Sequence, residues 1–360
     1  MMMRTVLLFL CIGIFQFNSF AQAIKNRIIC IGDAGEINDT QTKLIAKANE
    51  LVLSDKTKVF FLGDNIYPDG MELDSVGKKA SKLSLESQYQ TFRKAQVPVY
   101  FIAGNHDWNV SRVGGLVKLK AQEDYLLLQQ DANLKLIPKA GEPGPISIPI
   151  SDKVIAIVYD SEYWLYPHHE GDEISAEKRN VFLANLSALI TDHSDKQILL
   201  VSHHPMESFG EHGLSFGLKQ HIFPLTRFKS YLYLPLPILG TLYPLYRKNV
   251  MATAEDLPHP IYQDLISDVK NTVANHKNIV FVSGHDHGLQ FISHGDFNQI
   301  VSGSGSKTSY IRNHKNLMYK YQQQGFSVLD EMDDNTLIIS FYIHERNEIK
   351  KSFETVIKKK

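Results

Sequence analysis

The stretch KVFFLGDNIY, residues 58–67, joins a short apolar run to a polar ending. The run at residues 58–62 predicts a buried strand, because short apolar runs bounded by turn residues are typical of sheet cores. Gly63 then lets the chain turn sharply off the strand. Asp64 therefore stands at the carboxyl end of the predicted strand, where its carboxylate is a candidate ligand for a cation.

The same pattern occurs on both sides of this stretch, in RIICI-Gly32-Asp33 and in the segment that ends in Gly104-Asn105. Helical periodicity separates the three apolar runs. The predicted elements are, in order, a strand at residues 27–31, a helix at 39–53, a strand at 58–62, a helix at 85–95 and a strand at 97–103. This order predicts right-handed βαβ units and a buried parallel sheet.

The rest of the chain adds further strands and one segment of a different kind. Short turns at residues 295–296 and 333–335 separate the last strands, which predicts antiparallel hairpins. Residues 206–260 show few helix or strand patterns and are interpreted as an insertion. The additional strands are expected at residues 154–159, 197–202, 279–283, 289–293, 299–301, 325–329 and 337–342.

The composition of the chain excludes several classes of protein function. The 360 residues include 38 Lys and Arg against 39 Asp and Glu, a formal net charge of -1, so the excess of basic residues expected of a nucleic-acid binder is missing. The chain has 15 His and only 2 Cys, which excludes a disulfide scaffold and a Cys-rich zinc domain. The composition does not exclude a metal site built from His and Asp side chains.

Residues 1–23 are typical of an export signal. Arg4 precedes an apolar run at residues 6–17, and Ala21-Gln22-Ala23 supplies the small residues of a cleavage site. We expect export by the Sec route to the periplasm or the extracellular space, with residues 24–360 as the mature domain. The alternative is a short membrane anchor that stays attached.

Five short motifs each follow a predicted strand. In open α/β sheets the carboxyl ends of the strands form the ligand crevice, so residues far apart in sequence are expected to meet there. Two Asp, one Asn, one Tyr and three His make a mixed oxygen and nitrogen ligand set, which suits Zn, Fe or Mn. The motifs are Gly32-Asp33, Gly63-Asp64-Asn65-Ile66-Tyr67, Gly104-Asn105-His106-Asp107, Ser202-His203-His204-Pro205 and Gly284-His285-Asp286-His287.

The order GD, GDxxY, GNHD, HxP and GHxH resembles the calcineurin-like metallophosphoesterases, over roughly residues 28–306. Within that superfamily it is most similar to the purple acid phosphatases of the small tartrate-resistant type, which share Tyr67. Many members carry a His at the position of Gly35, and purple acid phosphatases usually carry Trp where this chain has Ala34. The resemblance implies a four-layer α/β/β/α sandwich with two sheets packed face to face and helices outside.

The resemblance also implies a ligand set for two metal ions. Two cations about 3.5–4 Å apart can clamp a phosphoryl group and bind a nucleophilic hydroxide. Asp64 would bridge the two, and the phenolate of Tyr67 favours Fe(III) at the first site, with Fe(II), Zn or Mn at the second. The first metal would be held by Asp33, Asp64, Tyr67 and His287, and the second by Asp64, Asn105, His203 and His285.

Three residues beside these ligands are candidates for catalysis and substrate binding. His106 follows Asn105, itself a candidate for substrate contact, and is the candidate general acid for the leaving group. Asp107 is expected to orient the His106 ring or to tune its pKa. His204 is a candidate for phosphate contact, the alternative being a solvent-facing loop residue.

We therefore expect an exported binuclear-metal phosphatase that hydrolyses small phosphomonoesters by attack of a metal-bound hydroxide. One alternative is a phosphodiesterase, or a nucleotide or lipid-phosphate hydrolase, of the same fold. Another is a non-catalytic, metal-dependent binding module. The complete ligand set and the presence of His106 disfavour this second alternative.

Residues 231–246 (YLYLPLPILGTLYPLY) are apolar almost throughout and carry no charge. The segment is too short and too rich in proline to span a bilayer as a helix. Basic residues flank it on both sides, which is typical of a segment that lies at a membrane interface. We expect an irregular lid packed on the core, or alternatively weak membrane contact with a preference for substrates that have an apolar body.

Overall fold

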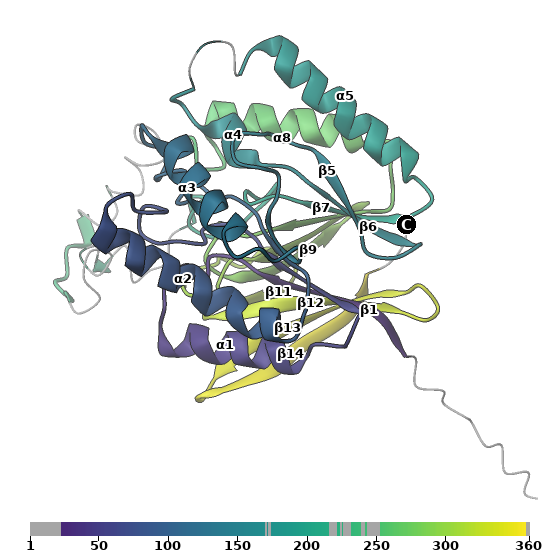
Figure 1. The fold of residues 1–360 in the computed structure, drawn as a ribbon, viewed down its shortest axis with the longest axis horizontal. Helices are drawn as coiled ribbons and strands as arrows, with labels where there is room; N and C mark the ends of the chain where they lie inside the picture. The colour runs from purple at the N-terminus through teal and green to yellow at the C-terminus, as the bar shows by residue number, and fades with distance from the viewer. Residues whose placement is uncertain are drawn as a thin grey trace, which may run out of the picture.

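In the computed structural model, two seven-stranded sheets pack face to face (Figure 1). The structure describes residues 23–357 apart from 170, 172–173, 216–221, 224, 226–231, 239–241 and 243–252. The export signal expected at residues 1–23 therefore lies outside the described residues, except for Ala23.

The first sheet combines four parallel strands with an antiparallel half. Strands β1 to β4 run parallel, β12 pairs antiparallel with β1, and β13 and β14 continue the antiparallel half. The spatial order is β14-β13-β12-β1-β2-β3-β4. Its strands are β1 (Ile24–Ile31), β2 (Thr57–Phe61), β3 (Val99–Phe101), β4 (Leu134–Leu136), β12 (Gly325–Met332), β13 (Leu337–Glu345) and β14 (Glu348–Ile357).

The second sheet also has a parallel centre, made by β6, β7, β8 and β10. Antiparallel strands close both of its edges, and the spatial order is β11-β9-β10-β8-β7-β6-β5. Its strands are β5 (Ile146–Pro149), β6 (Val154–Val158), β7 (Gln197–Val201), β8 (Ile279–Ser283), β9 (Leu289–His294), β10 (Phe297–Ser302) and β11 (Leu317–Tyr321).

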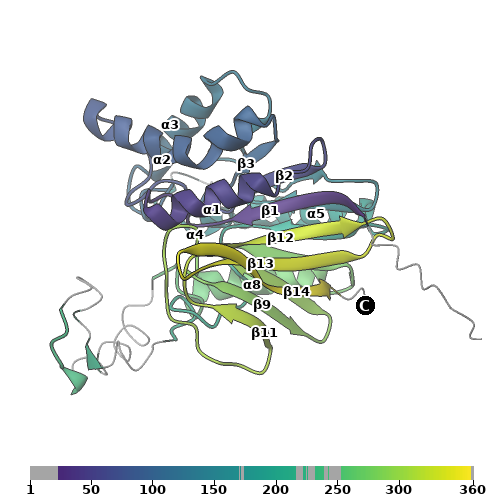
Figure 2. The same cartoon turned by 90° about the horizontal axis from the view of Figure 1, so that it is seen from below.

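Helices cover the outer faces of the two sheets. In Figures 1 and 2, α1 (Asp39–Glu50), α2 (Ser75–Lys94) and α3 (Gly115–Leu127) lie on the side of the first sheet. The short α4 (Ser161–Leu165), α5 (Ala176–Asp192) and α8 (Pro260–Val273) lie on the side of the second sheet. The described part of the chain is thus a four-layer α/β/β/α sandwich, as predicted.

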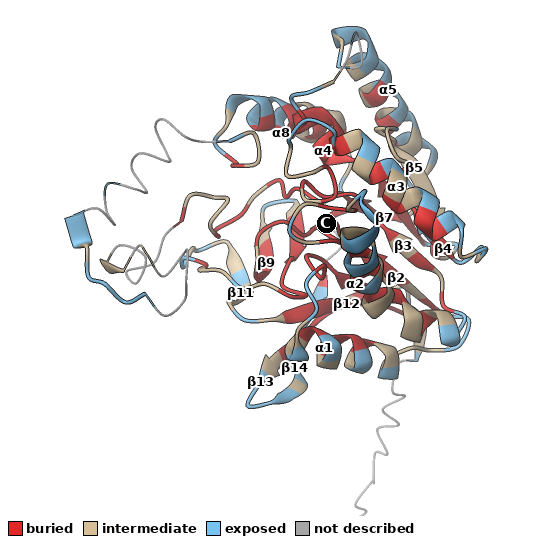
Figure 3. Cartoon of the chain, turned by 60° about the vertical axis from the view of Figure 1, so that its left-hand side comes forward, coloured by how far each residue is buried: buried red, intermediate tan, exposed pale blue. Residues whose placement is uncertain are grey.

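Strand alternation divides the core into two kinds of layer. Along β1, Ile28 and Cys30 join the cluster between the two sheets, whereas Ile29 and Ile31 join the cluster under the helices. This is the period of two that a strand imposes when both of its faces are buried. Figure 3 shows the result, with buried strands in the middle and exposed residues on the outer sides of the helices.

The predicted strands and the antiparallel hairpins are confirmed. The first predicted helix ends at Glu50, three residues earlier than expected, whereas the second is longer than expected. α2 begins ten residues before the predicted start at Leu85, because the Asp74 side chain caps it by accepting hydrogen bonds from the backbone N–H groups of Val76 and Gly77. The first half of α2 is too polar to reveal its periodicity. The sequence patterns also do not reveal α3, α5 and α8.

Residues 206–260, interpreted as an insertion, are only partly described. Residues 206–209 lie against the second sheet, where Met206 and Glu207 donate backbone hydrogen bonds to Gln299 of β10 and Phe209 donates one to Gln290 of β9. Within residues 231–246, only 232–238 and 242 are described, and Tyr233, Leu234, Ile238 and Leu242 are exposed. Among the described residues, no helix is both long enough and apolar enough to cross a membrane.

Candidate metal centre

The candidate ligands leave the strands in an unusual backbone conformation. Asp33 follows β1 with a φ of 56°, Asp64 follows β2 with 55°, and His285 follows β8 with 68°. L-residues adopt this left-handed region rarely, and such strain concentrates at functional sites. Because the strands of both sheets end at the same edge, the three side chains converge there.

The first group of ligand atoms gathers around the Tyr67 hydroxyl. This oxygen lies 3.0 Å from Asp64 Oδ2, 3.3 Å from Asp33 Oδ1 and 3.2 Å from His287 Nε2. Asp33, Asp64 and His287 offer ligand atoms that all lie within 4.8 Å of one another. Those are the four residues predicted for the first metal.

The second group gathers around His203 Nε2, which lies 3.1 Å from Asn105 Oδ1 and 3.2 Å from His285 Nδ1. Asp64 Oδ1 is 3.4 Å from the same nitrogen. One oxygen of Asp64 therefore faces the first group and the other faces the second. The structure brings all seven predicted ligands together and places Asp64 between the two groups.

The imidazole rings are oriented as metal ligands need to be. His203 Nδ1 lies 2.7 Å from the carbonyl oxygen of Leu62, and His285 Nε2 lies 2.8 Å from that of Glu255. A nitrogen that faces a carbonyl must carry the proton, which leaves Nε2 of His203 and Nδ1 of His285 free to bind a cation. Burial, followed by the neighbouring His212, lowers the pKa of His285 well below its usual range, so this ring is neutral.

The carboxylates show why cations fit here. Asp33 and Asp64 are both buried. Burial, and then the charge of Asp64, raise the pKa of Asp33 well above its usual range. Burial, and then the charges of Asp64 and Asp33, likewise raise the pKa of Tyr67. Two buried carboxyl groups beside a phenol lack a matching positive charge, which two divalent or trivalent cations would supply.

His106 lies at the rim of the centre. Its backbone N–H donates to Asp64 Oδ1 at 3.0 Å, and its ring Nε2 is 3.8 Å from Asp64 Oδ2. The side chain keeps 23% of its surface exposed, so an incoming molecule can reach it. The ring Nδ1 contacts the carbonyl oxygen of Pro68.

Asp107 is placed differently from the expectation. Its buried carboxylate accepts hydrogen bonds from the backbone N–H groups of Gly104 and Asn65 and from the Asn65 side chain, at 2.8 to 3.2 Å. The ring of His106 contacts Pro68 instead. This corrects the expectation that Asp107 orients His106, because Asp107 ties together the two loops that carry Asp64 and Asn105.

His204 is fully buried, so the alternative of a solvent-facing residue is wrong. Its ring Nδ1 lies 2.8 Å from the Ser161 hydroxyl, and the ring packs against His285 with centroids 4.3 Å apart. The role of His204 in phosphate contact stays a prediction.

His212 is a residue of the centre that sequence reasoning missed. Its ring lies 3.9 Å from the His285 ring and 6.3 Å from the His287 ring, measured between centroids. Nδ1 of His212 is 3.4 Å from Asp256 Oδ1. Both residues lie near the ends of residues 206–260. No predicted strand ends beside either of them, so the strand-end pattern that identified the other ligands could not identify His212.

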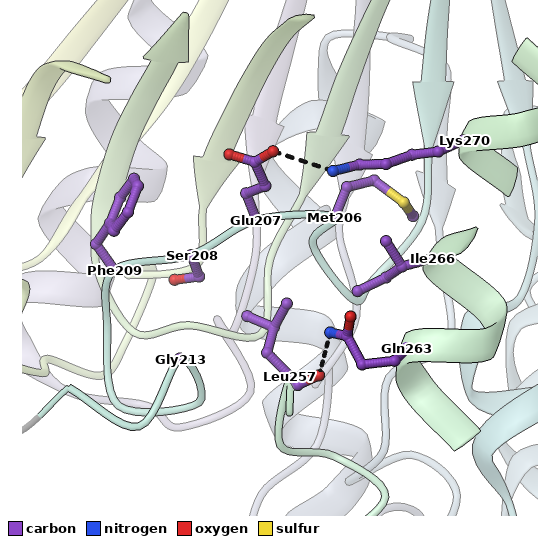
Figure 4. A pocket seen from close by; sticks show the side chains of 9 residues that line it. All are labelled: Met206, Glu207, Ser208, Phe209, Gly213, Leu257, Gln263, Ile266 and Lys270. Carbon is purple, nitrogen blue, oxygen red and sulfur yellow. Dashed lines mark hydrogen bonds and ion pairs between the residues drawn. The ribbon is translucent and has the colours of Figure 1, made fainter. Parts of the chain in front are cut away.

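A cavity of about 290 Å³ lies between residues 206–213 and helix α8 (Figure 4). Met206, Phe209, Leu257 and Ile266 give it apolar walls, and the 3.0 Å ion pair between Glu207 and Lys270 closes one side. None of the seven predicted ligands lines this cavity.

The chain belongs to the calcineurin-like phosphoesterase family, whose model matches residues 26–289. Members of this family are hydrolases of phosphate esters that depend on two metal ions, and the two groups of ligand atoms described above fit that chemistry. Within the family, the chain resembles the purple acid phosphatases. It is 23% identical over 316 residues to purple acid phosphatase 7 of Arabidopsis thaliana, covering 84% of this chain and 77% of that protein.

Solved structures share the fold at low identity. GAP50, the anchor in the inner membrane complex of Plasmodium, superimposes with a TM-score of 0.55 and 18% identity, covering 94% of this chain and 91% of that chain. The purple acid phosphatase PPD1 from yellow lupin (Lupinus luteus) superimposes with a TM-score of 0.52 and 15% identity, covering 91% of this chain and 53% of that chain. PhoD superimposes with a TM-score of 0.58 and 10% identity, covering 94% of this chain and 70% of that chain. These likenesses concern the fold alone.

Gly63 offers a test of how tightly the centre is packed. A Cβ atom at Gly63 would lie 2.3 Å from His203 Nδ1, at a φ of 93°. We expect Gly63→Ala to displace the His203 ring and to weaken metal binding about 10–100-fold, the usual loss when a group that supports a ligand is disturbed. Competition with a fluorescent chelator measures this loss.

Gly114→Ala is the matched control, because Gly114 has a φ of 86° and a Cβ atom added there would meet no atom within 4 Å. It carries the same backbone strain without the collision. Equal metal affinity in the two variants would contradict the prediction.

Proposed function

We propose that the protein is an exported phosphatase that hydrolyses phosphomonoesters of small molecules. The position of Asp64 carries this proposal, because its two carboxylate oxygens face two separate groups of metal-ligand atoms. A shared carboxylate holds two cations close enough to contact one phosphoryl group. When bound, the cations would supply Lewis acidity to the phosphoryl group and to a water molecule.

The side chains of this protein would then divide the remaining work. Asp33, Asp64, Tyr67 and the three histidines hold the positive charge in a buried place, where it acts strongly because the local dielectric is low. His106 stands at the open rim, 3.8 Å from Asp64. From there its ring would donate a proton to the oxygen of the leaving group.

A comparison of two substrates tests this role of His106. We expect the metal-loaded protein to hydrolyse phosphomonoesters faster than a bis-aryl diester, and to lose activity to a chelator. His106→Ala should retain both metals and lose ~10²–10⁴-fold in rate on an alkyl phosphate, and much less on an activated aryl phosphate, whose leaving group needs little protonation.

His168→Ala is the control, because His168 is an exposed histidine outside the two groups of ligands. Loss of metal in His106→Ala would make His106 a ligand. Faster hydrolysis of the diester would favour the phosphodiesterase alternative, and no turnover of any ester would favour the non-catalytic binding module.

We also propose Fe(III) in the first group, with Fe(II), Zn or Mn in the second. The Tyr67 hydroxyl lies among two carboxylates and a histidine, and its high pKa means that only a strongly charged cation would convert it to phenolate. A phenolate bound to Fe(III) gives a charge-transfer colour.

The oxidised, iron-loaded protein should therefore show a visible absorption band that Tyr67→Phe abolishes. Tyr100→Phe, which alters a half-buried tyrosine of β3 away from the ligands, should leave the band in place. An active wild-type protein that carries two metals but neither iron nor a visible band would contradict the assignment of iron.

We propose, in addition, that the segment at residues 231–246 contacts a membrane interface. The exposed Tyr233, Leu234 and Ile238 support this, since an apolar lid packed on the core would bury them. A surface of this kind gains free energy by entering the headgroup region of a bilayer.

The triple substitution Tyr233→Ser, Leu234→Ser, Ile238→Ser should reduce sedimentation with anionic liposomes at least severalfold, with unchanged hydrolysis of small aryl phosphates. The control removes three exposed apolar residues elsewhere, Val76, Val113 and Leu128, by the same change to Ser. If the wild-type protein does not sediment with liposomes, the membrane proposal fails.

A further inference from the structure

The backbone of the loop that follows β3 is strained beyond the ligand Asn105. Asn109, Val110 and Ser111 have φ values of 61°, 54° and 54°, so three successive residues other than glycine adopt the left-handed region. Such residues normally visit this region singly, and a β-branched residue such as Val110 is a clear outlier there. Strain of this kind persists only where other contacts fix the chain. Ser111, at the end of the strained turn, makes such contacts.

The Ser111 hydroxyl lies between two carboxyl groups. It is 2.6 Å from Glu162 Oε1 and 2.9 Å from Glu255 Oε1. Glu162 belongs to the short helix α4 and is fully buried, whereas Glu255 lies in irregular chain before α8. Three segments that are far apart in sequence therefore meet at one hydroxyl group. We call Ser111, Glu162 and Glu255 the Ser111 bridge.

Both contacts of Ser111 are hydrogen bonds only if Glu162 carries a proton. A hydroxyl has one proton to donate, so between two charged carboxylates one of the short contacts would be repulsive. A protonated Glu162 instead donates to Ser111 Oγ, and Ser111 donates its own proton to Glu255. Burial, and then the charge of Glu255, raise the pKa of Glu162 well above its usual range, which agrees with a neutral acid.

Ser111 is also the contact that holds the Glu162 side chain in place. The other carboxyl oxygen, Oε2, lies 3.7 Å from His204 Nε2, which is too far for a direct hydrogen bond. The position of the Glu162 carboxyl group therefore depends on the bridge.

Glu255 makes the backbone contact that orients a ligand of the second group. Its carbonyl oxygen lies 2.8 Å from His285 Nε2, so Nε2 carries the proton and Nδ1 is left to bind a cation. His285 Nδ1 lies 3.2 Å from Asn105 Oδ1, and Asn105 precedes Ser111 in the same loop. The Ser111 bridge thus links the loop that carries Asn105 to the residue that orients His285.

We propose that Ser111 and Glu162 are positioning residues for the second metal, and that Glu162 acts as an uncharged hydrogen-bond donor. The bridge fixes Glu255, and Glu255 fixes the tautomer and the direction of the His285 ring. Groups that support a ligand in this way typically contribute about 10–100-fold to metal affinity. The inference rests on the two-metal centre of the proposed function, but it concerns how the ion is held and not which ester is cleaved.

Metal titration of the chelator-stripped full chain tests the proposal without an activity assay. Competition for Zn²⁺ with a fluorescent chelator gives an affinity for each of the two ions, and Asn105→Ala identifies the step that belongs to the second group. Ser111→Ala and Glu162→Leu should each weaken that step about 10–100-fold and leave the other step unchanged. Ser340→Ala is the matched control, because this buried hydroxyl lies 3.0 Å from Glu354 Oε2 in the antiparallel half of the first sheet. It should change neither step.

Glu162→Gln separates a neutral donor from a charged carboxylate. The amide has the shape of the acid and donates an N–H group to Ser111 in place of the acid's O–H, so we expect both affinities to be kept. The infrared difference spectrum between the wild-type protein and Glu162→Gln at neutral pH should contain the carbonyl stretch of a protonated carboxyl group. This second readout does not depend on whether Ser111→Ala folds.

An unchanged second step in Ser111→Ala, a weakened second step in Glu162→Gln, or a difference spectrum without the protonated-carboxyl band overturns the proposal. Hydrolysis of phosphomonoesters by the wild-type protein is measured separately. A wild-type protein that hydrolyses them while any of these results appears would leave the proposed phosphatase function intact. A wild-type protein that binds two metals, shows the expected variants and hydrolyses no ester would refute the proposed function and support the positioning role.

Discussion

The rest of the centre depends on the contacts of the Asp64 carboxylate, which is buried between two groups of ligand atoms. It follows a strand of the first sheet, while His203, on its Oδ1 side, follows a strand of the second sheet. Asp33 makes a similar link, since its Oδ2 accepts from the backbone N–H of His285 at 2.9 Å. The centre therefore exists only when the two sheets meet at the correct register.

That register is fixed by close backbone packing at the ends of the strands. Gly32 N–H donates to the Ser302 carbonyl at 2.8 Å, and His203 reaches back to the Leu62 carbonyl. A Cβ atom at Gly104 would stand 2.4 Å from Asp64 Oδ1. Glycine is needed at such points because no side chain fits between the two halves of the site, so the same positions serve both the fold and the ligand geometry.

The parts of the site that follow regular strands could be predicted from sequence. The Gly-Asp and Gly-His endings mark where a parallel sheet delivers its ligands, which is why all seven candidates are found together. His212, Glu255 and Asp256 could not be found in this way, because they lie in irregular chain and reach the centre through tertiary packing. The expectation that Asp107 orients the His106 ring is wrong for a related reason, since neighbours in sequence need not be neighbours in hydrogen bonding. The other expectation, that Asp107 tunes the pKa of His106, stays a prediction.

The buried carboxylates of this protein separate into two kinds once their donors are compared. Asp107 and Asp160 accept N–H groups on both oxygens, so each is held by the protein alone. Asp33 and Asp64 each accept one backbone N–H, and their other contacts are the Tyr67 hydroxyl and histidine nitrogens at 3.0 to 3.5 Å. Buried charge with too few donors is costly unless a cation supplies the balance. Asp33 and Asp64, which face a phenol and imidazole nitrogens in place of a second N–H donor, therefore mark where a cation would supply positive charge.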